Sequence, residues 1–256
     1  MPSDSLPQIV EKVRRRTPAR LLTGRSGGAY RTSTQLELRA AHAAARDAVR
    51  SDFNIQLHLG RELIERFGIF EAFTQATSKD QFLLRPDLGR RLSAESQAKI
   101  AALCVGEPDL QIIIGDGLST TAVAVQIPPL LPLLAQGASE RKWTIGHPFA
   151  IRFCRVGILN DVGDLLRPRV TILLIGERPG LVTAESLSAY MAYRAQSGRT
   201  DADRNLISNI HARGIPTQEA ATRILNLAAK MMLLNSSGVK VREELPGGRS
   251  GLTEQE

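Results

Sequence analysis

Four places in the sequence put charged or hydrogen-bonding residues directly after a short apolar run. These residues are Asp116 and Gly117, Arg155 and Val156, Glu177 and Arg178, and Asn209 and His211. Carboxylate, guanidinium and amide groups on an apolar base suit a large ligand that is rich in amides and phosphate. Gly117 and Gly176 would let such a ligand approach the backbone closely. The structural alternative is that Glu177 and Arg178 pair with each other or with a sheet edge.

The sequence offers little for direct catalysis. The histidines show no metal-ligand spacing such as H-E-x-x-H; they are His42, His58, His147 and His211. There is no G-x-S-x-G elbow and no G-x-G-x-x-G fingerprint, and the glycine-rich turn at 24–28 lacks the ending of a phosphate loop. His211 is placed to act as a proton shuttle, although a hydrogen-bonded or solvent-facing histidine is the commoner role. These patterns therefore give little support to catalysis or metal binding by this chain, and the resemblance described below implies that it has no catalytic residue.

An alternating series of strands and helices would position the polar residues. Short apolar runs predict strands at 110–115, 149–153, 170–175 and 205–210. Segments with helical spacing predict helices at 120–125, 161–166, 184–193 and 217–232. This alternation indicates the α/β class, with a Rossmann-like, mostly parallel sheet and helices on both faces. The carboxyl ends of such strands line one crevice, where the four polar sets would meet.

The chain divides by composition into three predicted parts. Residues 1–100 form a helical N-terminal region, with a short basic helix at 9–16 and helical spacing from Leu57 to Phe73. Residues 101–243 form the Rossmann-like domain that carries the polar sets. Residues 244–256 are expected to be a disordered tail, because they are rich in glycine and charge.

Charge and composition limit the classes of partner. The formal net charge is +7, with arginine clusters at 14–16 and 85–91, which favours either phosphate binding or a partner-facing surface. Aromatic residues make up only 4% and are not interleaved with the basic ones, as nucleic-acid readers usually require. A stand-alone nucleotide- or nucleic-acid-binding module stays open as an alternative. Two cysteines, Cys104 and Cys154, in apolar surroundings argue against a disulfide framework, and the sequence predicts no membrane span.

Several ordered motifs resemble one known family. They are Ala19-Arg20 with Thr23-Gly24-Arg25, Arg85-Pro86-Asp87-Leu88-Gly89-Arg90-Arg91-Leu92, Pro108-Asp109-Leu110-Gln111, Asp116-Gly117-Leu118-Ser119, Gly176-Glu177-Arg178-Pro179-Gly180-Leu181 and Ile207-Ser208-Asn209-Ile210. In these motifs, from about residue 10 to residue 240, the chain resembles the small subunit of adenosylcobalamin-dependent ethanolamine ammonia-lyase.

The resemblance implies a function and a set of site residues. The family's enzyme converts ethanolamine to acetaldehyde and ammonia, its large subunit holds the substrate and the catalytic residues, and adenosylcobalamin lies between the two subunits. By this resemblance Val156, Glu177 and Leu206 contact the cofactor, although Leu206 falls where other members carry cysteine. Arg155 and Asp116, at neighbouring strand ends, complete the predicted cofactor-binding set. The resemblance also implies that residues 1–100 contact the large subunit, and that the protein is cytoplasmic, in some members inside a bacterial microcompartment.

Overall fold

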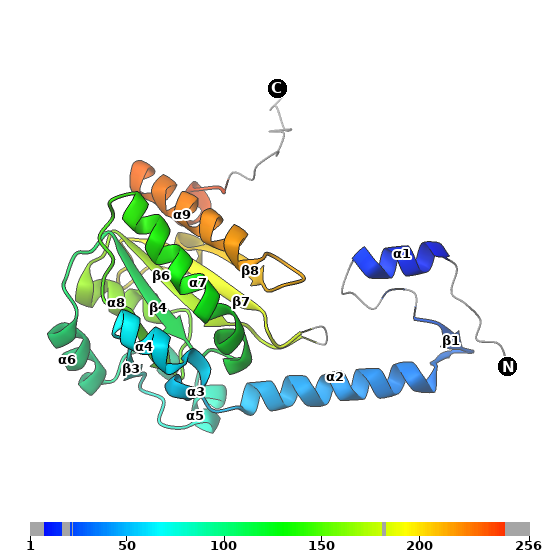
Figure 1. The fold of residues 1–256 in the computed structure, drawn as a ribbon. Coiled ribbons are helices and arrows are strands. Elements are labelled where there is room, and N and C mark those ends of the chain that lie inside the picture. Colours follow the sequence, from blue (N-terminus) through cyan, green and yellow to red (C-terminus); the bar gives the residue numbers. More distant parts are fainter. Residues whose placement is uncertain (1–7, 17–20, 22, 181–182, 244–256) are drawn as a thin grey trace.

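A six-stranded sheet forms the centre of the molecule. The computed structural model describes residues 8–16, 21, 23–180 and 183–243 (Figure 1). The strands lie in the order β3-β5-β4-β6-β7-β8. Their bounds are β3 Phe70–Phe73, β4 Leu110–Gly115, β5 Phe149–Arg152, β6 Val170–Gly176, β7 Leu187–Tyr193 and β8 Asn205–Ile210. The first four strands in this order pair in parallel, so the predicted mostly parallel α/β sheet is confirmed.

Strand β7 is the main correction to the sequence-based prediction, which placed a helix at 184–193. Its side chains alternate between the two faces of the sheet, with Leu187, Ala189 and Met191 in the core that lies under the long helices. This period of two is typical of a strand and outweighs the helical propensity of its alanines. Because β7 is antiparallel to both neighbours, β8 runs in the same direction as β6. The carboxyl end of β8 therefore lies at the same edge as those of β4, β5 and β6.

One face of the sheet is covered by two long helices and two short ones. The long helices are α7 (Thr120–Glu140) and α9 (Thr217–Leu234), and the short ones are α3 (Ile55–Leu59) and α4 (Arg61–Phe67). The hydroxyl of Ser119 caps α7 by accepting a hydrogen bond from the backbone N–H of Ala122. By length and composition α7 would suit a membrane span, but half of its most apolar window is buried, as expected of a core helix that packs against α9.

Shorter helices cover part of the opposite face. They are α6 (Ala94–Leu103) and α8 (Ile158–Leu166), whereas α5 (Lys79–Leu84) packs through Phe82 against Phe153 in a separate small cluster. The core on this side joins α6 and α8 to β3, β4, β5 and β6 and, through Ala192, to one end of β7. Over β7 and β8, in contrast, the Leu206 side chain stays 46% exposed and Tyr190 only half-buried. This face of β7 and β8 is called the open face below.

The N-terminal part extends away from the sheet. It comprises α1 (Gln8–Arg16), a hairpin of β1 (Arg25–Ser26) and β2 (Ala29–Tyr30), and α2 (Thr32–Arg50) (Figure 1). The helical spacing predicted up to Phe73 is wrong at its end, because Gly68 adopts a left-handed conformation, ends α4 and lets β3 join the sheet. Short 3₁₀ helices lie at Leu88–Arg90, Asp201–Asp203 and Gly238–Lys240. The predicted tail at 244–256 lies outside the described residues.

Candidate functional site

Asp116 is a structural anchor at the end of β4. Its side chain is 1% exposed, and its two carboxylate oxygens accept hydrogen bonds from the backbone N–H groups of Phe153 at 2.9 Å and Cys154 at 2.8 Å. Burial raises the pKa of Asp116, while the positive charge of Lys79 and these N–H groups act in the opposite direction. The carboxylate thus ties the loop after β4 to the loop that carries Arg155 and is not itself presented to a ligand.

The glycines at the ends of β4 and β6 serve contact between loops, which corrects their predicted role. A Cβ atom on Gly117 would lie 2.2 Å from the carbonyl oxygen of Gly176, and one on Gly176 would lie 2.0 Å from that of Ser119. The Leu118 N–H donates a hydrogen bond to the Gly176 carbonyl at 3.0 Å. The two loops therefore fill the space above β4 and β6, where a doubly wound sheet commonly places its ligand.

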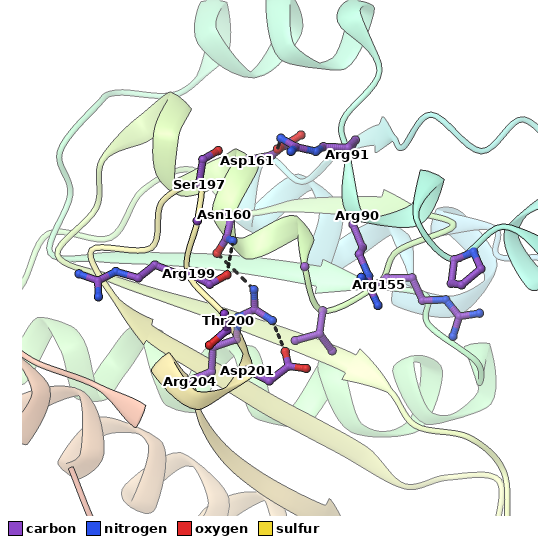
Figure 2. Close-up of a pocket in the computed structure, with 14 residues that line it drawn as sticks. Arg90, Arg91, Arg155, Asn160, Asp161, Ser197, Arg199, Thr200, Asp201 and Arg204 are labelled. Atoms are coloured by element: carbon purple, nitrogen blue, oxygen red, sulfur yellow. Dashed lines mark hydrogen bonds and ion pairs between the residues drawn. The ribbon is translucent and has the colours of Figure 1, made fainter. Parts of the chain in front are cut away.

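A first groove lies beside α8 and is called the Arg155 groove. It has a volume of about 540 Å³, and Arg155 and Val156 form part of its wall (Figure 2). The Asn160 side chain crosses to the opposite wall, where its amide donates to the Arg199 carbonyl at 2.9 Å and accepts from the Arg204 guanidinium at 3.2 Å. Arg204 in turn forms an ion pair with Asp201. These contacts fix the distance between the two walls.

A second groove lies on the open face and is called the Glu177 groove. It has a volume of about 480 Å³, and its lining includes Glu177, Tyr190, Leu206 and His211. Tyr190 is the cross-strand partner of Leu206, so their side chains share the open face. Burial is the largest cause that raises the pKa of Tyr190 to about 12, followed by the charge of Glu177 and a hydrogen bond to its carboxylate. The phenol thus stays protonated at neutral pH, with the Glu177 carboxylate as a neighbouring acceptor.

Three arginines line the two grooves. Burial, and then the charges of Arg178 and Arg90, lower the pKa of Arg155. The Arg155 guanidinium lies 4.2 Å from the centroid of the Phe82 ring, and its Nε is buried without a hydrogen-bond partner. Among the ion pairs of the described residues, none involves Arg90, Arg155 or Arg178. Glu177 and Arg178 therefore do not pair with each other. The Arg155 guanidinium donates to the carbonyl of Phe82 at 3.3 Å but has no acidic partner among the described residues.

The two grooves lie near one another, because charged residues of each groove act on a titratable group of the other. Arg155 of the first groove feels the charge of Arg178, which lines the second. Tyr190 of the second groove likewise feels Asp201 and Arg204, which line the first. Four of the five predicted cofactor-binding residues, all except Asp116, therefore line these two neighbouring grooves.

His211 has a structural role in the loop after β8. Its side chain is 7% exposed, and its Nδ1 accepts a hydrogen bond from the backbone N–H of Arg213 at 3.3 Å. Burial and then the charge of Arg213 lower the pKa of His211, so the ring is neutral near pH 7. The loop closes through a hydrogen bond from the Ile215 N–H to the carbonyl of Asn209, a residue in the left-handed conformation. Of the two roles predicted for His211, the structure therefore shows a hydrogen-bonded histidine and not a proton shuttle.

Sequence reasoning missed several residues of the grooves. Tyr190 was placed on a helix, and only the alternating pattern of β7 could have assigned it to the open face. Asn160, Asp201 and Arg204 carry no motif that would have marked them. In the described part of the chain, no three His, Cys, Asp or Glu side chains are grouped as a metal ion requires, and both cysteines are free and buried.

Comparison with known proteins gives the family. The family model described as ethanolamine ammonia-lyase light chain matches residues 7–242. The chain belongs to this family. The light chain is 42% identical over 227 residues to the ethanolamine ammonia-lyase small subunit of Fusobacterium nucleatum, a match that covers 89% of this chain and 75% of the relative. It is also similar to the small subunits of Clostridium acetobutylicum, with 39% identity and coverage of 88% and 91%, and Clostridium perfringens, with 40% identity and coverage of 90% and 76%.

Family membership confirms the resemblance that the motifs indicated. The light chain is a subunit of a carbon–nitrogen lyase, and a small subunit implies a large one in a hetero-oligomer. The alternative of a stand-alone nucleotide- or nucleic-acid-binding module has no counterpart among these matches.

Proposed function

We propose that this light chain supplies one half of an adenosylcobalamin site in ethanolamine ammonia-lyase. The large subunit would supply the other half, together with the substrate site and the catalytic residues. The observation that carries this proposal is that Glu177 and Leu206, far apart in the sequence, line one groove while Arg155 and Val156 line the neighbouring groove. The proposal includes a cytoplasmic location, and packaging in a microcompartment stays a prediction.

The shape of the surface suits a broad, flat ligand. The two grooves have volumes of about 540 and 480 Å³ and lie near one another on the half-covered side of the sheet. Val156, Tyr190 and Leu206 provide apolar contact area between the polar groups. Because a small-molecule site usually buries well over half of its ligand, a surface this open needs a second protein to close it.

The polar groups suit the chemistry of cobalamin. The Glu177 carboxylate is a strong acceptor for the amide side chains of a corrin, and Tyr190 lines the same groove. Arg90, Arg155 and Arg178 offer positive charge to the phosphodiester of the cofactor, and a guanidinium matches phosphate geometry well. Asp116 would act only indirectly, by fixing the loop that presents Arg155.

Bound there, adenosylcobalamin would supply the radical chemistry that converts ethanolamine to acetaldehyde and ammonia. The light chain's own residues would hold and orient the cofactor and exclude water from this side of it. Leu206 would contribute an apolar contact through its side chain.

The proposal is tested by removing the Glu177 charge without changing the shape of the side chain. In Glu177→Gln, cofactor affinity of the reassembled complex should fall about tenfold, since one charge-assisted hydrogen bond contributes roughly 1.5 kcal/mol. Glu140→Gln is the matched control, because it removes the same charge from an exposed position at the end of α7. Binding is measured by spectroscopic titration with adenosylcobalamin. Equal affinity of both variants and the wild type would contradict the proposed site.

A further inference from the structure

The position of Arg155 in the wall of its groove is set by a segment from another part of the chain. This segment, residues 82–90, begins within α5 and includes the 3₁₀ helix Leu88–Arg90. It meets the loop after β5 through a hydrogen bond from the backbone N–H of Arg155 to the carbonyl oxygen of Gly89 at 2.8 Å. The conformation of Arg155 therefore depends on residues that lie far away in the sequence.

Phe82 contacts the Arg155 guanidinium in two ways. The Cζ atom of Arg155 lies 4.2 Å from the centroid of the Phe82 ring, and a terminal nitrogen donates a hydrogen bond to the Phe82 carbonyl oxygen at 3.3 Å. The ring is 0% exposed and packs beside Phe153, with 6.1 Å between the two ring centroids. An aromatic face attracts a cation, and a closely packed ring keeps its orientation. Phe82 thus gives the guanidinium a fixed surface to lie on.

Gly89 leaves the space through which the Arg155 side chain passes. A Cβ atom on Gly89 would lie 2.7 Å from the Cγ atom of Arg155 and 3.2 Å from the nearest atom of the Phe82 ring. Any larger residue would therefore push the aliphatic part of Arg155 away from the ring. Phe82 and Gly89 are together called the Arg155 clamp below.

Opposite charge does not hold Arg155 in this position. Among the described residues, no carboxylate forms an ion pair with it. Its surroundings are cationic instead, because the Lys79 ammonium lies 5.2 Å from the centroid of the same Phe82 ring and Arg90 lies at the same end of the groove (Figure 2). The charge of Asp116 also acts on Arg155, but that carboxylate is buried and already accepts two backbone hydrogen bonds. The clamp thus holds a cation where like charges repel it.

We propose that the Arg155 clamp positions the guanidinium to recognise the phosphate group of the cofactor, so that Phe82 decides how strongly the site prefers ligands that carry a phosphate. This inference rests on the proposed cofactor site. A guanidinium has five N–H donors, and the Phe82 carbonyl accepts from one of its terminal nitrogens. Neither Phe82 nor Gly89 lines the groove, so both act through Arg155. A guanidinium fixed before binding loses little conformational freedom on binding, which favours affinity for a phosphate.

Two cofactor analogues that differ only by the phosphate test the clamp. They are adenosylcobinamide phosphate and adenosylcobinamide, and spectroscopic titration of the reassembled complex measures the affinity for each and for adenosylcobalamin. Phe82→Leu removes the ring face but keeps an apolar side chain, and Gly89→Ala is a second variant that displaces Arg155 without changing Phe82. Phe149→Leu is the matched control, because Phe149 is also 0% exposed but lies in the sheet core at the start of β5. Circular dichroism and sedimentation confirm folding and assembly of each complex.

The two clamp variants should lose affinity selectively. In Phe82→Leu, the affinity for adenosylcobalamin and for adenosylcobinamide phosphate should fall about fivefold, as expected for one lost cation–π contact, and that for adenosylcobinamide should stay unchanged. Gly89→Ala should show the same selectivity, and Phe149→Leu should keep the wild-type ratio. Both analogues are titrated against the same protein sample, so a partial loss of folded protein affects both titrations alike. A change in the ratio of the two affinities therefore reports on the position of Arg155.

Arg155→Met separates the clamp from the cofactor site. This variant should lose the preference for the phosphate, and Phe82→Leu added to it should have no further effect. If Arg155→Met weakens adenosylcobalamin binding but both clamp variants keep the wild-type ratio, the clamp is overturned and the cofactor site stands. Equal losses for the two analogues in the clamp variants would assign Phe82 to the fold alone and would also overturn it. Wild-type adenosylcobalamin affinity in both Arg155→Met and Glu177→Gln would overturn the cofactor site and the clamp together.

Discussion

Replacement of Asp116 by alanine tests whether this buried carboxylate serves the fold or the ligand. Its two oxygens accept hydrogen bonds from the N–H groups of Phe153 and Cys154, and Phe153 adopts a left-handed φ of 58° that the loop must maintain. The alanine variant leaves both buried donors without a partner. At roughly 1–3 kcal/mol for each, the free energy of unfolding should fall by about 2–6 kcal/mol.

The lower part of this range is expected, because burial of the carboxylate itself has a cost, as the raised pKa of Asp116 indicates. Asp116→Asn is the matched variant: it has nearly the same shape, keeps one acceptor oxygen and loses the other. It should lose about half as much stability. A loss of this size is a large fraction of the 5–15 kcal/mol by which most domains are stable.

Urea unfolding of the full chain, followed by far-ultraviolet circular dichroism, measures both losses. Cofactor titration of the reassembled complex with the Asn variant provides the second measurement, and its affinity should stay within about threefold of the wild type, since Asp116 acts through the position of Arg155. An alanine variant as stable as the wild type, together with an Asn variant that binds adenosylcobalamin tenfold more weakly, would refute a structural role and restore Asp116 to the ligand site.

Two further predictions concern the loops beside the grooves. Gly176→Ala should lower the melting temperature by several degrees, because the new Cβ would lie 2.0 Å from the backbone oxygen of Ser119, whereas Gly28→Ala, with nothing within 4 Å, should leave it unchanged. Equal melting temperatures would show that the two loops can separate freely. Because the pKa of His211 is lowered on folding, the unfolded chain binds more protons just below pH 6.5, and stability should rise with pH through this range. His211→Gln should flatten this rise in urea unfolding at pH 5.5 and 7.5, and an unchanged slope would contradict a buried neutral ring.

The sequence predicts the centre of the sheet well because the constraint there is local. The run Val170–Gly176 is buried at every position, and a strand with two buried faces cannot alternate polar and apolar residues. Strand β7 escaped prediction because its outward-facing residues include Ser188 and Ala192, which are small and buried rather than charged. Its alternation is therefore weak, and its alanines favour a helix.

The candidate site could be predicted only where a motif marks it. Glu177 and Leu206 were assigned from motifs, but nothing in the sequence placed them in one groove, since this depends on the reversal of β7 that brings Leu206 beside Tyr190. Arg155 was predicted from its position after a strand. Its proximity to two other arginines, Arg90 and Arg178, could not be predicted, because the fold alone brings the three together. Motifs identify single residues of the site, and the topology of the sheet brings them together.

The incomplete covering of the sheet explains why this fold needs a second protein. Six strands at about 4.8 Å spacing span roughly 24 Å, and helices packed side by side occupy about 10 Å each. Two helices, α6 and α8, therefore cover about four strands, and the core on this side reaches from β3 only as far as Ala192 of β7. The open face of β7 and β8 is left with Leu206 exposed beside unpaired arginines. A ligand that lay on this face alone would keep its outer side in water, so the proposed cofactor site would require a lid from another chain.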